Sequence, residues 1–274
     1  MNQPARDLDR LLETARRAAL GAAGILRDRL GRVHTVTYKG RINLVTEADT
    51  AAEAAILAAI RADFPNAAIL AEESGGPEAA ADEDLLWVVD PLDGTTNFTH
   101  GYPFFCTSIA VLSRGEPIAA IIHDPTRGET FAAARGRGAF QDGRPMCVSN
   151  ASDLESSLLC TGFVFDRDSD LDRPLGRFER AQRASRGVRR DGSAALDLAY
   201  VAAGRLDGFF ELRLKAWDVA AGFLLVREAG GRVTRSDGTH AGVFDGDMVA
   251  TNGRIHDALR TLIGPVDVQQ EVPS

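Results

Sequence analysis

The sequence predicts a mixed α/β (α+β) fold, and three observations lead to this prediction. Apolar residues recur at helical spacing near the N-terminus, from Leu8 to Leu26. Short apolar runs separated by turn residues follow between about 85 and 141. After about Asn150, strands alternate with longer helical segments, which is the pattern of an α/β lobe.

Two helices are predicted in the first quarter of the chain. The residues from Leu8 to Leu26 form one long amphipathic helix, because their apolar positions lie three or four residues apart. Thr46 is expected to cap a second helix that runs to about Ile60. Glu47 and Asp49 would lie in its first turn, where acidic side chains interact favourably with the helix dipole.

Five short apolar segments predict the strands of the first lobe. They are Leu85 to Val89, Phe105 to Leu112, Ile118 to His123, Glu129 to Ala133 and a return near Ala139. Gly136-Arg137-Gly138 and Asp142-Gly143 are typical of hairpin turns.

The second lobe carries four predicted helices. They lie near Leu171 to Arg183, Ala194 to Ala203, Val219 to Ala229 and His256 to Leu262. No clear linker separates the lobes, so residues 1–150 and 151–265 are expected to form one continuous catalytic unit. Residues 266–274 are polar and contain a proline, so we expect a flexible tail.

Composition excludes several classes of function. The chain has 274 residues and a net charge of −8, so nonspecific attraction to nucleic acid or to anionic lipid is not expected. The N-terminus lacks an apolar signal region and no apolar run approaches a membrane span, so we expect a soluble, cytoplasmic protein. Three cysteines without a CxxC pair favour reduced thiols.

The most informative segment is Asp90-Pro91-Leu92-Asp93-Gly94-Thr95-Thr96-Asn97-Phe98. Two carboxylates flank a proline that should end the preceding strand, and Gly94 permits close approach by a ligand. Thr95 and Thr96 can open a helix whose first N–H groups bind an anion. Acidic side chains beside an anion site require a cation between them, so the segment indicates Mg²⁺ plus phosphate. The alternative is an ordinary turn in which Thr95 or Thr96 is the helix N-cap.

This segment resembles the signature of the inositol monophosphatase family, which are Mg²⁺-dependent phosphatases of the fructose-1,6-bisphosphatase superfamily. Further blocks of the family pattern appear in order: Leu44-Val45-Thr46-Glu47-Ala48-Asp49, Ala71-Glu72-Glu73-Ser74, Gly192-Ser193-Ala194-Ala195, Glu211 and Trp217-Asp218-Val219-Ala220-Ala221-Gly222. Ala71 replaces the usual glycine and Asn43 a frequent aspartate. The resemblance implies a layered α-β-α-β-α sandwich, a homodimer and inhibition by Li⁺.

The resemblance also implies a metal site with two or three Mg²⁺ ions, consistent with the preference of Mg²⁺ for hard oxygen ligands. Glu72, Asp90 and the Leu92 carbonyl would hold one ion, and Asp90, Asp93 and Asp218 a second. A third would reach Glu72 through water. Asp49, Glu72 and Thr95 are the expected catalytic residues, because they would orient and activate the attacking water.

Substrate contacts are assigned to both lobes by the same resemblance. They are Leu92, Asp93, Gly94, Thr95, Gly192, Ser193, Ala194, Glu211 and Asp218. Glu211 can accept hydrogen bonds from vicinal hydroxyl groups, and Thr96-Asn97 resembles the inositol branch of the family. The predicted reaction is therefore Mg²⁺-dependent hydrolysis of a polyol phosphate monoester, with myo-inositol monophosphate as the expected substrate.

Simpler interpretations remain open at several positions. Asp218 can be a plain helix N-terminal acid, Glu72 a solvated loop residue, Asp49 a capping residue and Glu211 a surface strand residue. Arg213 and Lys215 can face solvent or favour a more anionic substrate. The alternative functions are a sugar bisphosphate or histidinol-phosphate phosphatase, or a non-catalytic homologue that binds a partner through the basic run from Arg183 to Arg190.

Overall fold

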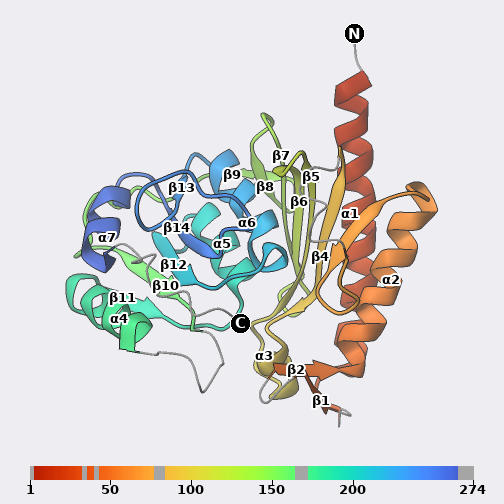
Figure 1. Cartoon of the computed structure of the whole chain (residues 1–274), viewed down its shortest axis with the longest axis horizontal. Helices are drawn as coiled ribbons and strands as arrows, with labels where there is room; N and C mark the ends of the chain where they lie inside the picture. The colour runs from red at the N-terminus through yellow and green to blue at the C-terminus, as the bar shows by residue number, and fades with distance from the viewer. Residues whose placement is uncertain (1–2, 33–35, 40–42, 77–83, 164–171, 265–274) are drawn as a thin grey trace.

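The chain folds into five stacked layers of helices and sheets (Figure 1). The computed structural model describes residues 3–32, 36–39, 43–76, 84–163 and 172–264. Two helices cover a seven-stranded sheet, two further helices lie between this sheet and a five-stranded sheet, and two helices cover the far side. This arrangement confirms the predicted α-β-α-β-α sandwich.

The first layer consists of α1 (Gln3–Arg29) and α2 (Glu47–Asp63), which pack together and against the seven-stranded sheet. Leu11, Ala15 and Leu26 of α1 are buried with Ile56 and Ile60 of α2 in one apolar cluster. The N-cap of α2 is Thr46, whose hydroxyl accepts the Ala48 N–H while Asp49 accepts the Thr46 N–H. The predicted capping box is therefore present. A short antiparallel pair, β1 (Val36–Lys39) and β2 (Asn43–Thr46), precedes this helix.

The seven-stranded sheet has the order β3-β4-β5-β6-β7-β8-β9, and only its β3–β4 pair is parallel. Its strands are β3 (Ala68–Ala71), β4 (Leu86–Asp93), β5 (Cys106–Ser113), β6 (Glu116–Asp124), β7 (Glu129–Ala134), β8 (Ala139–Gln141) and β9 (Arg144–Met146). Alternate β4 residues are buried on opposite faces of the sheet. Trp87 and Val89 pack in the apolar cluster formed with α1 and α2, whereas Leu86 and Val88 pack in the cluster formed with the helices on the other face. Both faces are therefore buried.

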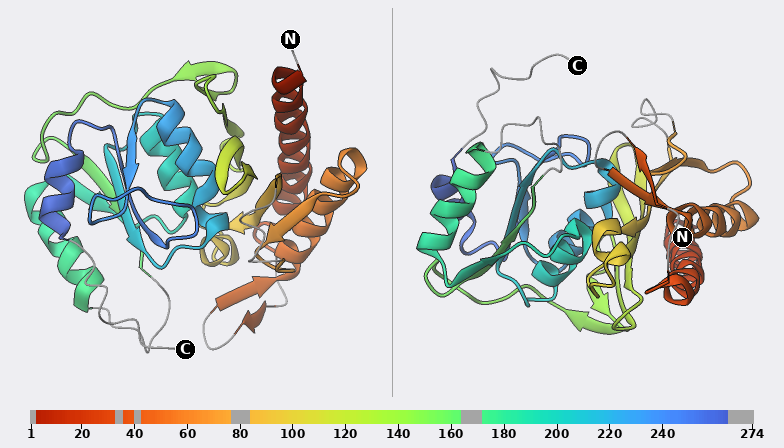
Figure 2. Two further views of the ribbon diagram at one scale, coloured as in Figure 1. Left: turned by 45° about the horizontal axis from the view of Figure 1, so that its top comes forward. Right: turned by 90° about the horizontal axis from the view of Figure 1, so that it is seen from below.

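The central helices are α5 (Ala194–Ala202) and α6 (Ala216–Glu228). They pack against each other, α6 lies on β5 and β6, and α5 also contacts β12, so together they join the two sheets. Figure 2 shows them between the sheets in both views. Gly222 allows the close α5–α6 contact, because a Cβ there would lie 2.4 Å from Cβ of Leu198.

The five-stranded sheet has the order β11-β10-β12-β14-β13. Its strands are β10 (Leu158–Thr161), β11 (Gly187–Arg189), β12 (Gly208–Leu212), β13 (Arg232–Thr234) and β14 (Asp247–Thr251). The last layer is formed by α4 (Asp172–Ala184) and α7 (His256–Ile263), which pack on each other and on the strands β11 and β14. The predicted tail at 266–274 and the predicted helix start at Leu171 lie outside the described residues.

Two local predictions were wrong. Pro91 does not end its strand, because β4 continues to Asp93 through a register irregularity opposite β5. The irregularity lies at Pro91, which has no N–H to donate to β5. The Pro91 carbonyl accepts the Thr107 hydroxyl at 3.0 Å. The last of the central helices begins at Ala216 rather than Val219, so Asp218 lies inside its first turn.

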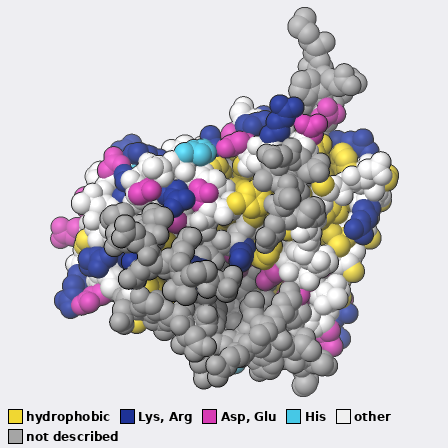
Figure 3. Space-filling view, in the orientation of Figure 1, with side chains coloured by type: hydrophobic (Ala, Val, Ile, Leu, Met, Phe, Trp, Pro, Cys, Tyr) yellow, Lys and Arg dark blue, Asp and Glu magenta, His cyan; other side chains and the backbone are white. Residues whose placement is uncertain are grey.

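The described surface is charged and mixed in sign. Figure 3 shows Lys and Arg side chains interspersed with Asp and Glu on the described part of one face. Within the described residues, every helix is too short or too polar to cross a bilayer. Cys106, Cys147 and Cys160 are all free thiols.

Candidate active site

Carboxyl groups from distant parts of the chain meet beside the C-terminal end of β4. Asp90 and Asp93 belong to that strand, and Glu72 follows the parallel neighbour β3, where its N–H donates to the Val89 carbonyl at 3.1 Å. Asp218 comes from the first turn of α6, where its Oδ2 accepts the Lys215 N–H at 2.7 Å. The interpretation of Asp218 as a helix N-terminal acid is thus correct but incomplete.

These carboxyl groups perturb one another. The Glu72 and Asp90 side chains interact directly, so both carboxyls cannot readily be ionised at the same time without a cation between them. Burial, followed by the neighbouring charge of Asp218, raises the pKa of Glu72 to about 8. Burial and the charge of Glu72 raise the pKa of Asp90 well above its usual value. Burial and Asp93 raise the pKa of Asp218 to about 7.

The cluster fits a hard divalent cation. In the part of the chain that the structure describes, no three Asp, Glu, His or Cys side chains form a ready-made metal site. However, Glu72, Asp90, Asp93 and Asp218 offer only oxygen donors and resist simultaneous ionisation. A bound cation would relieve that repulsion. The Leu92 carbonyl, the predicted backbone ligand, lies between the two β4 aspartates in the sequence and is 3.1 Å from the Thr95 hydroxyl.

Thr95 and Asp49 are paired, as the resemblance implied. The Thr95 hydroxyl lies 3.1 Å from Oδ1 of Asp49 and 3.1 Å from the Leu92 carbonyl oxygen, and it can donate to either. Asp49 is completely buried, and this burial raises the pKa of its carboxyl despite the opposing hydrogen bonds from Thr46 and Thr95. Asp49 therefore serves both the α2 cap and Thr95, so the capping interpretation alone does not account for it.

Neither Thr95 nor Thr96 is a helix N-cap. The short helix α3 (Thr95–Thr99) is capped by Gly94, which has a φ of 98°. A Cβ at Gly94 would lie 3.0 Å from the Phe104 carbonyl oxygen. Glycine is therefore required both by the left-handed backbone and by the close approach of Phe104 and Phe105, which precede β5.

The segment before α5 engages Asp93. Oδ2 of Asp93 accepts the Ser193 hydroxyl at 2.7 Å and the Ala195 N–H at 2.7 Å, and the Ala194 N–H also bonds to this carboxylate. These bonds oppose the effect of burial, which raises the pKa of Asp93 to about 6. Ser193 is 1% exposed, so its hydroxyl is committed inside the protein.

Glu211 lies beside the same cluster. Burial, and then the charge of Asp218, raises the pKa of Glu211 to about 8, so the surface-strand interpretation does not hold. Its carboxylate lies over Gly162, where any Cβ would overlap its oxygens at 2.1 Å. Arg190 is half-buried and its charge opposes the rise, whereas Arg213 and Lys215 are exposed.

Three residues have supporting roles that the sequence does not predict. Glu53 accepts the Glu73 and Ser74 N–H groups, both at 2.9 Å. Asn97 donates to the Phe104 and Asp191 carbonyls at 2.7 and 2.8 Å, which links α3 to the segment before Gly192. Asp197 is 1% exposed, and burial raises its pKa well above the usual value. Glu53 and Asp197 look like ordinary helix residues in the sequence, whereas Asn97 lies in the signature segment and marks only the inositol branch there.

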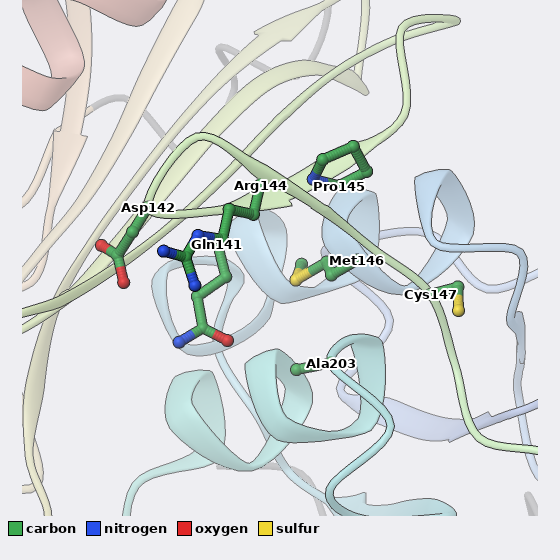
Figure 4. A pocket seen from close by; sticks show the side chains of 7 residues that line it. All are labelled: Gln141, Asp142, Arg144, Pro145, Met146, Cys147 and Ala203. Carbon is green, nitrogen blue, oxygen red and sulfur yellow. The ribbon is translucent and has the colours of Figure 1, made fainter.

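A surface cavity of about 590 Å³ lies away from these residues (Figure 4). It is lined by residues of the β8–β9 hairpin, the segment that follows it and the end of α5: Gln141, Asp142, Arg144, Pro145, Met146, Cys147 and Ala203. None of the predicted site residues lines it, so the carboxyl cluster and not this cavity is the candidate active site.

Comparison with known proteins decides the family. Residues 7–265 match the model of the inositol monophosphatase family. The chain belongs to the inositol monophosphatase family. It is 46% identical to an inositol-1-monophosphatase of Synechocystis over 92% of this chain and 88% of that protein. It is 47% identical to the Nus factor SuhB of Pseudomonas aeruginosa, over 93% and 96% of the two chains.

A solved structure supports the same assignment. The inositol monophosphatase of Anabaena superposes with a TM-score of 0.85 at 45% sequence identity, covering 94% of this chain and 96% of that one. The predicted family is therefore confirmed, together with the inositol monophosphatase fold.

Proposed function

We propose that this protein is a Mg²⁺-dependent phosphatase that hydrolyses a phosphate monoester of a polyol, with myo-inositol monophosphate as its substrate. The observation that carries the proposal is the convergence of Glu72, Asp90, Asp93 and Asp218, whose pKa values are all raised by burial and, for all but Asp93, also by neighbouring carboxylates. Such a cluster is costly to bury without a function that uses its charge. Family membership supports a phosphatase.

Glu72, Asp90 and the Leu92 carbonyl would hold one Mg²⁺, and Asp90, Asp93 and Asp218 a second. Bound Mg²⁺ supplies positive charge to the phosphate oxygens and lowers the pKa of a coordinated water. The protein's own contribution is to fix the ligand directions: Leu92 N–H bonds to Oδ1 of Asp90 at 2.9 Å, and the start of α5 bonds to Asp93.

The Thr95–Asp49 pair would orient the attacking water. Thr95 Oγ can accept a hydrogen bond from water while its own proton is donated to Oδ1 of Asp49. The raised pKa of Asp49 makes its carboxylate a better proton acceptor than an exposed aspartate at neutral pH. An in-line attack needs no covalent phosphoenzyme.

Glu211 and the Gly192–Ala194 segment would contact the polyol. The Glu211 carboxylate lies beside Asp218 and can accept hydrogen bonds from vicinal hydroxyls, while the positive charge of Arg190 acts on it from the β11 side. A sugar bisphosphate or histidinol phosphate is the alternative substrate for the same site. We further propose that the protein forms a homodimer, as the family resemblance implies, and that it is located in the cytoplasm.

Phosphate release from myo-inositol 1-phosphate, with and without Mg²⁺, tests the proposal. Asp93→Asn should reduce turnover by at least 100-fold, because the substitution removes charge from the cluster and disturbs the bonds to α5. Unchanged turnover in this variant would eliminate the site. Phosphate release from fructose 1,6-bisphosphate and from histidinol phosphate, measured alongside myo-inositol 1-phosphate, shows which of the three is the preferred substrate.

A second candidate function is suggested by relatives named Nus factor SuhB. In that case the protein would act by binding a partner macromolecule. Absence of Mg²⁺-dependent phosphate release from every phosphate ester of the panel, in a folded protein, would favour this role over catalysis.

A further inference from the structure

One face of α2 carries Asp49 and contacts the two segments that contain the other predicted catalytic residues, Glu72 and Thr95. Asp49 and Glu53 lie four residues apart in α2 and therefore point to the same side. Asp49 accepts the Thr95 hydroxyl at 3.1 Å. Glu53 instead contacts the turn that follows β3, in which Glu72 lies.

Glu53 completes the hydrogen bonding of this turn. Ala71 N–H donates to the Gly75 carbonyl, Gly75 N–H donates to the Ala71 carbonyl, and Glu72 N–H donates to Val89. The two N–H groups in between, those of Glu73 and Ser74, donate to Oε2 and Oε1 of Glu53 at 2.9 Å each. Five consecutive N–H groups are thus satisfied, and two of them depend on a single side chain.

The environment makes this contact strong. The Glu53 side chain is 4% exposed, so water cannot readily replace it. A carboxylate that accepts two N–H groups forms charge-assisted bonds, which are shorter and stronger than neutral ones. Removing the acceptor would leave two N–H groups of the turn without their partner.

We propose that Glu53 is a positioning residue that fixes the direction of the Glu72 carboxyl toward Asp90. Glu53 does not touch the substrate or a metal; it acts by holding the backbone immediately after Glu72. The inference rests on the proposed function only in assigning Glu72 to a Mg²⁺ site.

The test is Mg²⁺ binding measured by calorimetry on Glu53→Gln, which keeps the shape but replaces one acceptor oxygen with a donor NH₂ group. We expect about a tenfold weaker Mg²⁺ affinity, the size of effect usual for groups that orient metal ligands. Glu179→Gln is the matched control, because Glu179 forms an exposed ion pair with Arg183 on α4, and it should bind Mg²⁺ like the wild type.

A double-mutant cycle with Glu72→Gln shows whether Glu53→Gln weakens Mg²⁺ binding by misplacing Glu72 or by disturbing the whole site. If Glu53 acts through Glu72, then Glu53→Gln should weaken Mg²⁺ binding no further in the Glu72→Gln background. The same fold loss in both backgrounds, or wild-type affinity in Glu53→Gln, would overturn the proposal. Should Glu53→Gln fail to fold, Glu53→Asp, which keeps the charge on a shorter side chain, replaces it in the cycle.

The binding measurement remains decisive if the proposed function fails. A wild-type protein that binds Mg²⁺ but releases no phosphate would reject the phosphatase proposal and leave the Glu53–Glu72 coupling to be decided by calorimetry alone. Conversely, full activity with unaltered Mg²⁺ affinity in Glu53→Gln would reject the positioning role and leave the phosphatase proposal standing.

Discussion

The Ser193 hydroxyl donates a 2.7 Å hydrogen bond to Oδ2 of Asp93, exactly one hundred residues earlier in the chain. Asp93 ends a strand of the seven-stranded sheet, and Ser193 is the N-cap of α5. The Ala195 N–H donates to the same oxygen at 2.7 Å. The start of α5 therefore holds the Asp93 carboxylate of the seven-stranded sheet in place. The positive end of the α5 dipole also stabilises the negative charge of Asp93.

Ser193→Ala should lower kcat/KM for myo-inositol 1-phosphate about tenfold, because Asp93 loses one of the donors that orient it. The free energy of unfolding should fall by about 1–2 kcal/mol, since the variant also loses the α5 cap. Ser193→Thr retains the hydroxyl and is the control. Enzyme kinetics and urea unfolding measure both effects, and equal activity in the two variants would contradict the positioning of Asp93 by Ser193.

Gly94→Ala and Gly101→Ala form a matched pair. Both glycines have positive φ angles, of 98° and 69°, but a Cβ at Gly94 would lie 3.0 Å from the Phe104 carbonyl oxygen, whereas Gly101 has open space. We expect a loss of about 1 kcal/mol at Gly101 and roughly 2–3 kcal/mol at Gly94. Only Gly94→Ala should also reduce activity. Equal unfolding free energies for the two variants would show that the backbone at Phe104 and Phe105 moves to accommodate the added methyl group.

Local signals in the sequence were sufficient for much of the fold. The Thr46–Asp49 capping box is a short-range pattern, and α2 starts where that pattern predicts. The helix boundaries near Ala194 and His256 agree with the structure to within one residue at each end. Pro91 was misjudged because its missing N–H is accommodated by a register irregularity, which depends on the partner strand β5.

The supporting contacts of the site could not be predicted in the same way. Glu53 bonds to residues 20 and 21 positions later, and Asn97 bonds to the Asp191 carbonyl 94 positions later. Nothing in the neighbouring residues specifies such a partner, because the contact exists only after the layers have packed. The roles of the carboxylates came from resemblance to a family, not from local pattern.

Mg²⁺ should stabilise this protein more at pH 8 than at pH 5. The folded-state pKa values of the proposed metal ligands Glu72 and Asp218 are raised to about 8 and 7, above those of the unfolded chain. Without metal, the stability from these groups is full below their unfolded pKa values near 4, and it is lost as pH rises from there through about 7–8. Added Mg²⁺ competes with the protons, so its stabilisation grows with pH.

Thermal unfolding in Mg²⁺ and in EDTA, at both pH values, measures this difference. Asp93→Asn serves as the control, because its altered cluster should show a smaller gain from Mg²⁺. An equal gain at pH 5 and pH 8 in the wild type would contradict a metal site built from these carboxyl groups.

His256, which lies outside the carboxyl cluster, should make the free energy of unfolding fall as pH falls. This is the opposite of the pH dependence expected from the carboxyl groups. Its ring is completely buried, with Nε2 2.8 Å from Thr234 Oγ1 and Nδ1 2.9 Å from Thr251 Oγ1. Thr234 donates its proton to the Arg235 carbonyl, so it accepts from Nε2, and Nδ1 is left to accept from Thr251. The network therefore suits a neutral ring, and burial, followed by the charge of Arg232, lowers its pKa to about 4.

The unfolded chain takes up this proton near pH 6.5, but the folded protein does so only near pH 4. His256 therefore contributes stability that is full above about pH 6.5 and is lost as pH falls toward 4, by up to roughly 3 kcal/mol. Urea unfolding of the wild type and His256→Gln across this range tests the prediction. The carboxyl groups contribute equally to both proteins and cancel in the difference, so parallel stability curves would mean that folding does not shift the pKa of His256.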